Sequence, residues 1–307
     1  MLSNLIVVAE QVGVLFLLMG VGFVMGKLGL VDQRTTGQMS TLLLYVISPC
    51  LLVDALQRPF TAELLRAMGL GCALLVLQYA ALIVISQMTF RKAPRETSAV
   101  LRYAQVYSNN IFMGLPLVQA ALGDAAAIFV VPSMVGSAVF QWTHGVALMG
   151  SKISPKKVIL NPGILGIIAG MVFFVGRITL PTVIGSAISF LGSMNTPLAM
   201  IIIGVQMAGA DMKSTFSQPA LYGVSAIRLI ASPIITLLIM LPFRQTSPDL
   251  FCALVILSAA PSAGVTSIFA QKFGQDVTSA AQVVSLSTLL SLVTLPIFAA
   301  LAKSLAF

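Results

Sequence analysis

Long apolar segments recur along this chain from its first residues to its last, and few folds can accommodate them. A helix that crosses the hydrocarbon core of a membrane needs about 20 consecutive apolar residues. The sequence therefore predicts an all-α polytopic membrane protein with ten transmembrane helices. Short polar breaks separate the ten segments, which are residues 5–27, 37–57, 62–90, 97–122, 125–150, 159–177, 182–210, 218–243, 249–272 and 276–304.

Composition excludes a soluble domain and limits the partners. Of 307 residues 58% are hydrophobic and 8% are charged, whereas soluble proteins carry about 25% charged residues. The net charge of +8 reflects the loops, and no basic cluster occurs with aromatics as on a nucleic-acid-binding surface. With the N-terminus outside, ten Lys and Arg fall in inner loops and five in outer ones. This bias predicts a multi-pass protein with both termini outside.

The two halves of the sequence resemble each other at an offset of 150 residues. Five is an odd number of helices, so the second copy must enter the membrane from the opposite side. We therefore predict two inverted five-helix repeats, residues 1–150 and 151–307. The spacing of Gly13 and Gly20 further predicts a helix face that another backbone approaches closely. The matching pairs are Gly13 and Gly163, Leu15 and Leu165, Gly20 and Gly170, Phe23 and Phe173, Gly26 and Gly176, and Leu30 and Leu180.

The fourth segment contains polar and helix-breaking residues where lipid offers no hydrogen bonds. Within the membrane, non-helical backbone is tolerated only where it is buried in protein or lines a cavity. One interpretation is a broken helix that forms part of a polar site. The other is a proline-kinked helix whose Asn side chains only bind neighbouring helices. The candidate site residues in this segment are Ser108, Asn109, Asn110, Gly114 and Pro116.

The ninth segment is interrupted at the corresponding place, which favours the broken-helix interpretation. When Gly123 is aligned with Gly274, Asn110 falls on Pro261, and Ser262 follows. Paired interrupted segments are the best sequence indication of a transporter site. We expect the broken helices 4 and 9 to cross, with Pro116 and Pro261 near the starts of the second half-helices. Their N-termini would then favour an anion.

Several motifs resemble those of the auxin efflux carrier family. They are Tyr107–Leu117 in segment four, Asn161–Gly163 opening segment six, Pro197–Gly204 in segment seven, and residues 287–296 in the last segment. The resemblance covers the whole chain and implies a scaffold packed against a transport domain that carries the crossed helices. It also implies transport of small organic anions. The short Ser151–Lys157 loop favours the bacterial malonate or malate type, and hence a location in the bacterial inner membrane.

Two polar residues outside the interrupted segments complete the candidate site. Arg228 lies about 15 Å deep in segment eight, where a charge is expensive and usually functional. The alternatives are a structural partner of Glu10 or Asp54, or a snorkelling side chain. Asn195 precedes Pro197 in segment seven and either joins the site or simply begins a helix.

The sequence therefore predicts a secondary active or facilitative transporter of a mono- or dicarboxylate, such as malonate, malate or an auxin-like acid, by alternating access. The interrupted segments contain no Asp or Glu, which suits an anion better than a cation. The alternative is a Na⁺-coupled organic-anion symporter of the bile-acid-transporter type. An intramembrane enzyme is a weaker rival, because the sequence has a single His and no hydrolase or metalloprotease motif. A membrane sensor is also weaker, because we would expect it to carry a soluble signalling domain. We predict no enzyme activity, metal site or cofactor, and leave Na⁺ or H⁺ coupling and a homodimer open.

Overall fold

The computed structural model describes the backbone of residues 2–307, and the side chains there except those of residues 2–5, 7, 33, 155, 157 and 212. In this range the chain is helical, and its one extended pairing is a single bridge. The helices of the first half are α1 (Leu2–Lys27), α2 (Gln33–Leu42), α3 (Ser48–Ala55), α4 (Ala62–Met88), α5 (Arg95–Val106), α6 (Leu115–Leu122), α7 (Val131–Phe140) and α8 (Val146–Leu148). Those of the second half are α9 (Pro155–Ile159), α10 (Pro162–Val175), α11 (Thr182–Ser193), α12 (Asn195–Gly209), α13 (Met212–Phe216), α14 (Pro219–Ala226), α15 (Ser232–Met240), α16 (Pro248–Ala259), α17 (Val265–Lys272) and α18 (Val277–Ala306).

Tighter and wider turns join several of these helices. The turns η3 (Asp124–Val130) and η6 (Leu241–Phe243) are 3₁₀, whereas η1 (Leu43–Ile47), η2 (Asn110–Gly114), η4 (Gln141–Gly145) and η5 (Ile227–Ala231) are π-helical. Three of the π-helical turns end two residues before a proline: Pro49, Pro116 and Pro233. Proline lacks an N–H, and its ring presses on the preceding turn. The wider turn absorbs that conflict without ending the helix.

Seven helices in the described residues are long and apolar enough to cross a membrane. Three predicted segments give only shorter apolar helices, Asn110–Leu122, Pro162–Val175 and Pro248–Ala259. Two of these are short because segments four and nine are interrupted. The third has 14 residues, or about 21 Å of helix, against about 30 Å of hydrocarbon. The polytopic membrane fold is thus established, while the count of ten spans stays a prediction.

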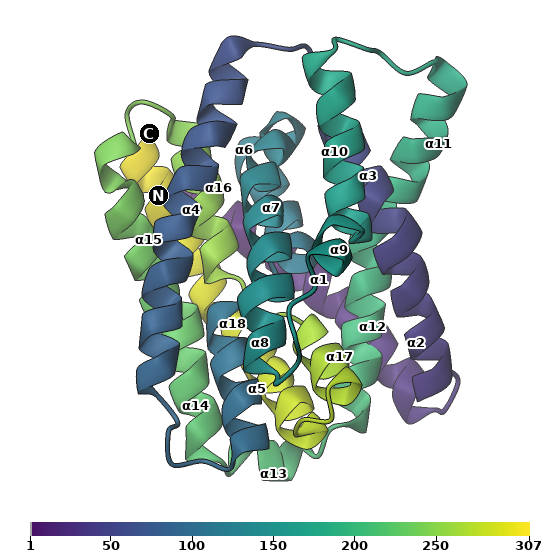
Figure 1. Ribbon diagram of the computed structural model, residues 1–307, viewed down its shortest axis with the longest axis vertical. Helices are drawn as coiled ribbons and strands as arrows, with labels where there is room; N and C mark the ends of the chain where they lie inside the picture. Colours follow the sequence, from purple (N-terminus) through teal and green to yellow (C-terminus); the bar gives the residue numbers. More distant parts are fainter. Residues whose placement is uncertain (1) are drawn as a thin grey trace.

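The helices pack in two groups that contact each other where α1 packs on α18 and α6, and each group takes helices from both halves of the chain. In one group α1 packs on α12, and α10 and α11 pack on α3. In the other, α4 packs on α7 and α15, and α18 packs on α5, α14 and α16. Figure 1 shows α3, α10 and α11 on the right and α4, α14 and α15 on the left. This packing is compatible with a scaffold and a transport domain; the inverted repeat stays a prediction.

Glycines let α1 and α12 approach each other until their backbones touch. A Cβ on Gly204 would lie 2.0 Å from the Met19 carbonyl oxygen, and one on Gly22 would lie 2.1 Å from that of Ile201. The prediction that Gly13 and Gly20 form the close contact is wrong, because neither has a neighbour within 4 Å of an added Cβ. Gly22 lies on the face of α1 that meets α12, whereas Gly20 lies on an exposed face.

We expect Gly204→Ala to destabilise the protein, because the added methyl group overlaps backbone atoms that can move only if α1 and α12 separate. Overpacking of this kind costs about 1–3 kcal/mol. Thermal unfolding in detergent should show a clear fall in Tm. Gly20→Ala is the matched control and should leave Tm unchanged or slightly higher, because alanine favours helix. Equal Tm values for both variants would contradict the assigned contact.

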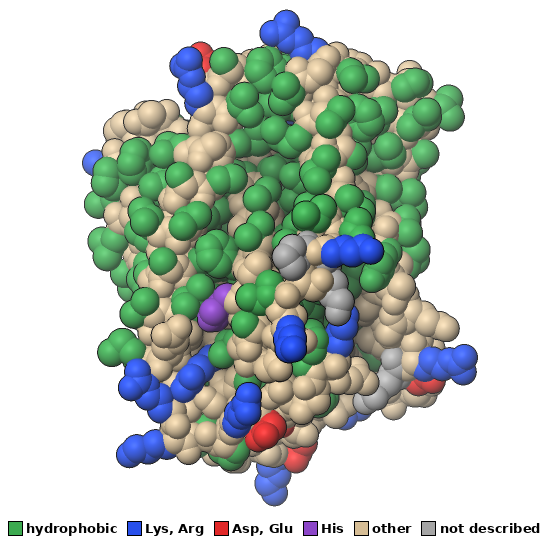
Figure 2. Space-filling view, in the orientation of Figure 1, with side chains coloured by type: hydrophobic (Ala, Val, Ile, Leu, Met, Phe, Trp, Pro, Cys, Tyr) green, Lys and Arg blue, Asp and Glu red, His purple; other side chains and the backbone are tan. Residues whose placement is uncertain are grey.

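The surface is apolar over a broad band. Large hydrophobic side chains face outward there, with Val183 82% exposed and both Leu17 and Phe190 74% exposed. Figure 2 shows hydrophobic side chains over the middle and upper part of one face, while most of the visible Lys and Arg gather at the lower end. Exposing such a band to water is unfavourable, whereas hydrocarbon chains of a bilayer solvate it well. The protein is therefore a multi-pass membrane protein.

Candidate functional site

The two interruptions meet in the interior and are joined by backbone hydrogen bonds. Ser108 and Ser262 form an antiparallel bridge. The Asn109 N–H donates to the Pro261 carbonyl at 2.7 Å, and the Ala263 N–H donates to the Tyr107 carbonyl at 2.9 Å. All six residues are buried. Two extended segments thus satisfy each other where lipid cannot, so segment four is a broken helix and not a kinked one.

Each interruption separates two half-helices, and the second member of each pair begins at the crossing. The first runs through η2 and α6, and the second is α17. Both end at a glycine with positive φ, +85° at Gly123 and +65° at Gly274, which stops the helix without strain. The positions predicted for the two prolines are wrong. Pro116 lies six residues after the half-helix begins, and Pro261 lies in the extended segment four residues before α17.

Arg228 holds the C-terminal ends of the other two half-helices. Its Nη1 donates to the Val106 carbonyl at 2.9 Å and to the Gln105 carbonyl at 3.3 Å, at the end of α5. Its Nη2 donates to the Ser258 carbonyl, at the end of α16, and to the Ser232 hydroxyl. These partners are carbonyl and hydroxyl groups, not carboxylates. A helix C-terminus carries about half a negative charge, so one buried guanidinium balances two half-helix ends.

The two asparagines at the crossing have different surroundings. Asn110 Nδ2 lies 2.6 Å from Ser137 Oγ and 2.8 Å from Ser133 Oγ, so this side chain ties the half-helix to α7. Asn109 is 4% exposed, and its Nδ2 has no hydrogen-bond partner among the described residues. Thr266, in the first turn of α17, likewise has an unpartnered hydroxyl. Asn109 and Thr266 therefore keep unused hydrogen-bonding capacity beside the crossing, although their atoms are sealed from solvent.

Two cavities lie between the crossing and the helices α1, α2 and α12. A narrow cavity of about 30 Å³ touches the first turns of both second half-helices, at Phe112 and at Gly264 and Val265. A wider cavity of about 440 Å³ lies between α1, α6 and α12, and Pro116 and Asp124 line it. Both cavities adjoin α12, the narrow one at Ala199–Gln206 and the wide one at Thr196 and Pro197.

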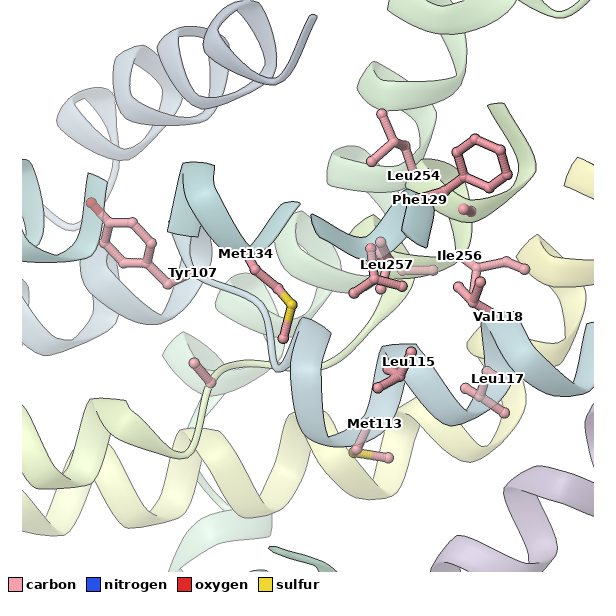
Figure 3. Packing of buried hydrophobic residues seen from close by; sticks show 14 of the residues in the cluster. Tyr107, Met113, Leu115, Leu117, Val118, Phe129, Met134, Leu254, Ile256 and Leu257 are labelled. Carbon is pink, nitrogen blue, oxygen red and sulfur yellow. The ribbon is translucent and has the colours of Figure 1, made fainter. Parts of the chain in front are cut away.

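Of the nine candidate residues, Pro116 lines the wide cavity, and the other eight line neither cavity. A Cβ on Gly114 would lie 2.6 Å from Leu257 Cδ2, so Gly114 permits close packing of the half-helix on α16. Leu115 and Leu257 belong to the buried hydrophobic cluster there (Figure 3). Ser262 is fully used, since its hydroxyl donates to the Ala104 carbonyl and its N–H donates to Ser287. Asn195 accepts a hydrogen bond from Ser48 of α3 and is not among the residues that line either cavity.

Sequence reasoning missed several residues of the site. Ser133 and Ser137 accept hydrogen bonds from Asn110. The sequence pattern that could have indicated them is two small hydroxyl residues, four positions apart, in an apolar segment. Gln206 supplies an amide to the wall of the narrow cavity, and it was visible only as a polar residue within the apolar run of segment seven. Phe112 lies inside the motif of segment four, but its apolar side chain did not indicate a site. It lines the narrow cavity because it lies in the first turn of the half-helix.

The fold and the crossing define a class: a multi-pass membrane protein whose interrupted helices meet beside a cavity, as in secondary transporters. The family model described as membrane transport protein matches residues 7–158 and 150–299. The chain therefore belongs to this family, the auxin efflux carriers, and the resemblance seen in the sequence is confirmed. The family is one of membrane transporters, not of enzymes.

Two relatives match over nearly the whole chain. The chain is 25% identical over 284 residues to a Rhizobium meliloti protein named "Putative malonate transporter". The aligned region covers 86% of this chain and 87% of the relative. It is 23% identical over 302 residues to an "Uncharacterized transporter" of Methanothermobacter thermautotrophicus. This aligned region covers 94% of this chain and 96% of the relative. These matches support transport as the class of function and leave the substrate to other arguments.

Proposed function

We propose that the protein is a secondary carrier of small organic anions, and that the carboxylate binds in the narrow cavity beside the crossing. One observation carries this proposal: the first turns of two half-helices reach the same cavity, and no acidic side chain of the described residues lines it. The first N–H groups of a helix lack intrahelical partners, and its N-terminus carries about half a positive charge. Two such ends aimed at one place favour a negatively charged guest.

The donors at this place can be named. In the first half-helix the earliest intrahelical bond is the one that Met113 donates to the Asn109 carbonyl at 3.2 Å. The N–H groups of Ile111 and Phe112 precede it, and so does the Asn109 side chain, whose Nδ2 has no partner in the described residues and lies outside the cavity lining. In α17 the corresponding groups are the N–H of Val265 and the unpartnered hydroxyl of Thr266. We propose that these groups coordinate the two oxygens of a carboxylate.

The wide cavity supplies a path for alternating access in this proposal. It lies at the end of the molecule where the Arg58 guanidinium donates to the Asp124 carbonyl. We propose that this end faces outward, because the opposite end holds most of the Lys and Arg residues. In this arrangement the wide cavity is the outer vestibule, and substrate passes along α12 from Thr196 towards the crossing.

Malonate is the first substrate to test, because one relative is named "Putative malonate transporter". The purified protein in proteoliposomes should take up labelled malonate, and excess unlabelled malonate should suppress the uptake at least about tenfold. Substrate should also raise Tm in detergent, because a ligand that binds only the folded state stabilises it. Empty liposomes are the control. The absence of uptake and of any Tm shift across a panel of small carboxylates would contradict the proposal.

The driving force is decided in the same assay. Uptake that requires an inward Na⁺ gradient would identify a Na⁺-coupled symporter, and uptake that requires a pH gradient would identify proton coupling. We propose carriage without Na⁺, because Arg228 already supplies a cation at the half-helix C-termini. Substituting choline for Na⁺ should therefore leave uptake unchanged.

A further inference from the structure

The two groups of helices contact each other almost entirely through packing and not through hydrogen bonds. The first group comprises α1–α3 and α10–α12, and the second comprises α4–α8 and α13–α18. Between them, α1 packs on α18 and α6, α12 packs on η2, and α10 packs on α7. Among the described residues, a single hydrogen bond joins the two groups, and the others lie within a group or a connection. Such a contact lets the groups move relative to each other without leaving buried polar groups unpaired.

Arg58, in the connection between α3 and α4, makes that hydrogen bond. Its Nε donates to the Ala55 carbonyl at 3.1 Å, at the end of α3. Its Nη2 donates to the Asp124 carbonyl, where η3 begins directly after the half-helix of η2 and α6. The guanidinium therefore joins the end of α3 in the first group to the start of η3 in the second.

The same half-helix end has a second cation, which comes from its own group. Lys303 of α18 donates from Nζ to the Ala121 carbonyl at 2.8 Å. A cation at a helix C-terminus is favourable, and Lys303 supplies it however the two groups are placed relative to each other. What Arg58 adds is the link to α3.

The link lies at the edge of the wide cavity. Asp124 lines this cavity, and its other walls come from α1 and α12 of the first group and from α6 of the second. Because the walls belong to both groups, a movement of one group against the other changes the width of the cavity. With Arg58 bound to the Asp124 carbonyl, the cavity measures about 440 Å³.

We infer that Arg58 is a positioning residue, which holds the two groups in the arrangement with the wide cavity open and releases Asp124 in each transport cycle. This inference rests on the proposed function, because alternating access requires the outer vestibule to close. Arg58 is half-buried. One hydrogen bond from such a group is strong enough to bias the equilibrium between two arrangements and weak enough to break at each turnover.

A cross-link at this place tests whether the contact must break. Arg58→Cys and Ala125→Cys are combined in a protein whose three native cysteines are replaced by alanine, and a flexible bifunctional maleimide joins them. Ala125 follows Asp124 and is exposed. The joined protein should take up labelled malonate at least about tenfold more slowly than before the reaction, because the groups can no longer separate at this end. Lys303→Cys with Ala125→Cys is the matched control: its cross-link lies within the second group and should change uptake less than about twofold.

Labelling of a single cysteine in the wide cavity gives a readout that needs no substrate. Gln11→Cys, on the α1 wall, is labelled with a fluorescent maleimide in lipid nanodiscs. Arg58→Met should slow this labelling at least about threefold, because the open arrangement loses its link. Arg58→Lys should give an intermediate rate, since lysine keeps one donor for the Asp124 carbonyl. Lys303→Met removes the other cation of the half-helix and should leave the labelling rate unchanged.

The outcomes separate the inference from the function on which it rests. Full uptake by the joined Arg58→Cys and Ala125→Cys protein, or equal labelling of Arg58→Met and the natural protein, would overturn the inference while carboxylate transport stands. Equal slowing by Arg58→Met and Lys303→Met would also overturn it, because the effect would then belong to the helix end and not to a link between the groups. If the natural protein carries no carboxylate, the proposed function fails, and the labelling alone decides whether Arg58 holds the wide cavity open.

Discussion

Arg228→Met is expected to unfold the protein or lower its Tm sharply, because it leaves two half-helix ends without their cation. The buried Val106 carbonyl would lose its guanidinium donor, and the Ser258 carbonyl would keep only the long hydrogen bond, 3.4 Å, from the Ser232 hydroxyl. Breaking a buried charged contact by removing one partner costs about 3–5 kcal/mol. Methionine fills a similar volume, so the effect reports lost hydrogen bonds and charge. Thermal unfolding in detergent measures it, and uptake of labelled malonate should disappear with the fold.

Arg228→Lys separates this structural role from a direct contact with substrate. Lysine keeps the positive charge but offers one nitrogen in place of the two that serve α5 and α16, so we expect partial loss of Tm. The variant that remains folded should bind substrate with nearly unchanged affinity, because Arg228 lines neither cavity. A fully stable Arg228→Met protein with weakened substrate binding would instead assign Arg228 to the substrate.

Asn109→Asp is expected to abolish transport while leaving the protein folded. A carboxylate at the N-cap of a half-helix is favourable for stability. It also occupies the positive potential on which the substrate depends, so an anionic substrate meets a like charge. We expect uptake to fall at least about 100-fold, equivalent to about 2.7 kcal/mol. Asn109→Ala removes a donor without adding charge and should weaken binding by about 10- to 100-fold.

Asn110→Ala is the matched comparison at the next position. Its amide is already used by Ser133 and Ser137, so its loss should lower Tm, at a cost of about 1–3 kcal/mol. Asn109→Ala should leave Tm nearly unchanged, since its Nδ2 has no partner in the described residues. If the two variants exchange these behaviours, with Asn109 supporting the fold and Asn110 the substrate, the assignment of roles is wrong.

The contrast between these asparagines shows how far the sequence could reach. Both lie in one motif and have the same side chain, so sequence pattern gave them the same role. Their environments differ because Asn110 begins a half-helix that packs on α7, while Asn109 lies in the extended segment before it. The glycines behave similarly: spacing indicated Gly13 and Gly20, but the contact with α12 uses Gly22 and Gly204.

The class of fold and the place of the interruptions follow from the sequence alone. Apolar length specifies helices in a membrane, and the matched polar, proline and glycine residues of segments four and nine indicate where the helices are interrupted. These are local properties, since each depends on a residue and its neighbours along the chain. The family follows from the same motifs.

Only the tertiary structure decided what each polar group does. Arg228 binds backbone carbonyls more than 100 residues away in sequence at α5, and no local pattern could reveal that partner. The same holds for Asn109, whose side-chain Nδ2 has no hydrogen-bond partner among the described residues. A buried polar group takes its role from whichever groups the fold brings within hydrogen-bonding distance, and that distance is set by the packing of distant helices.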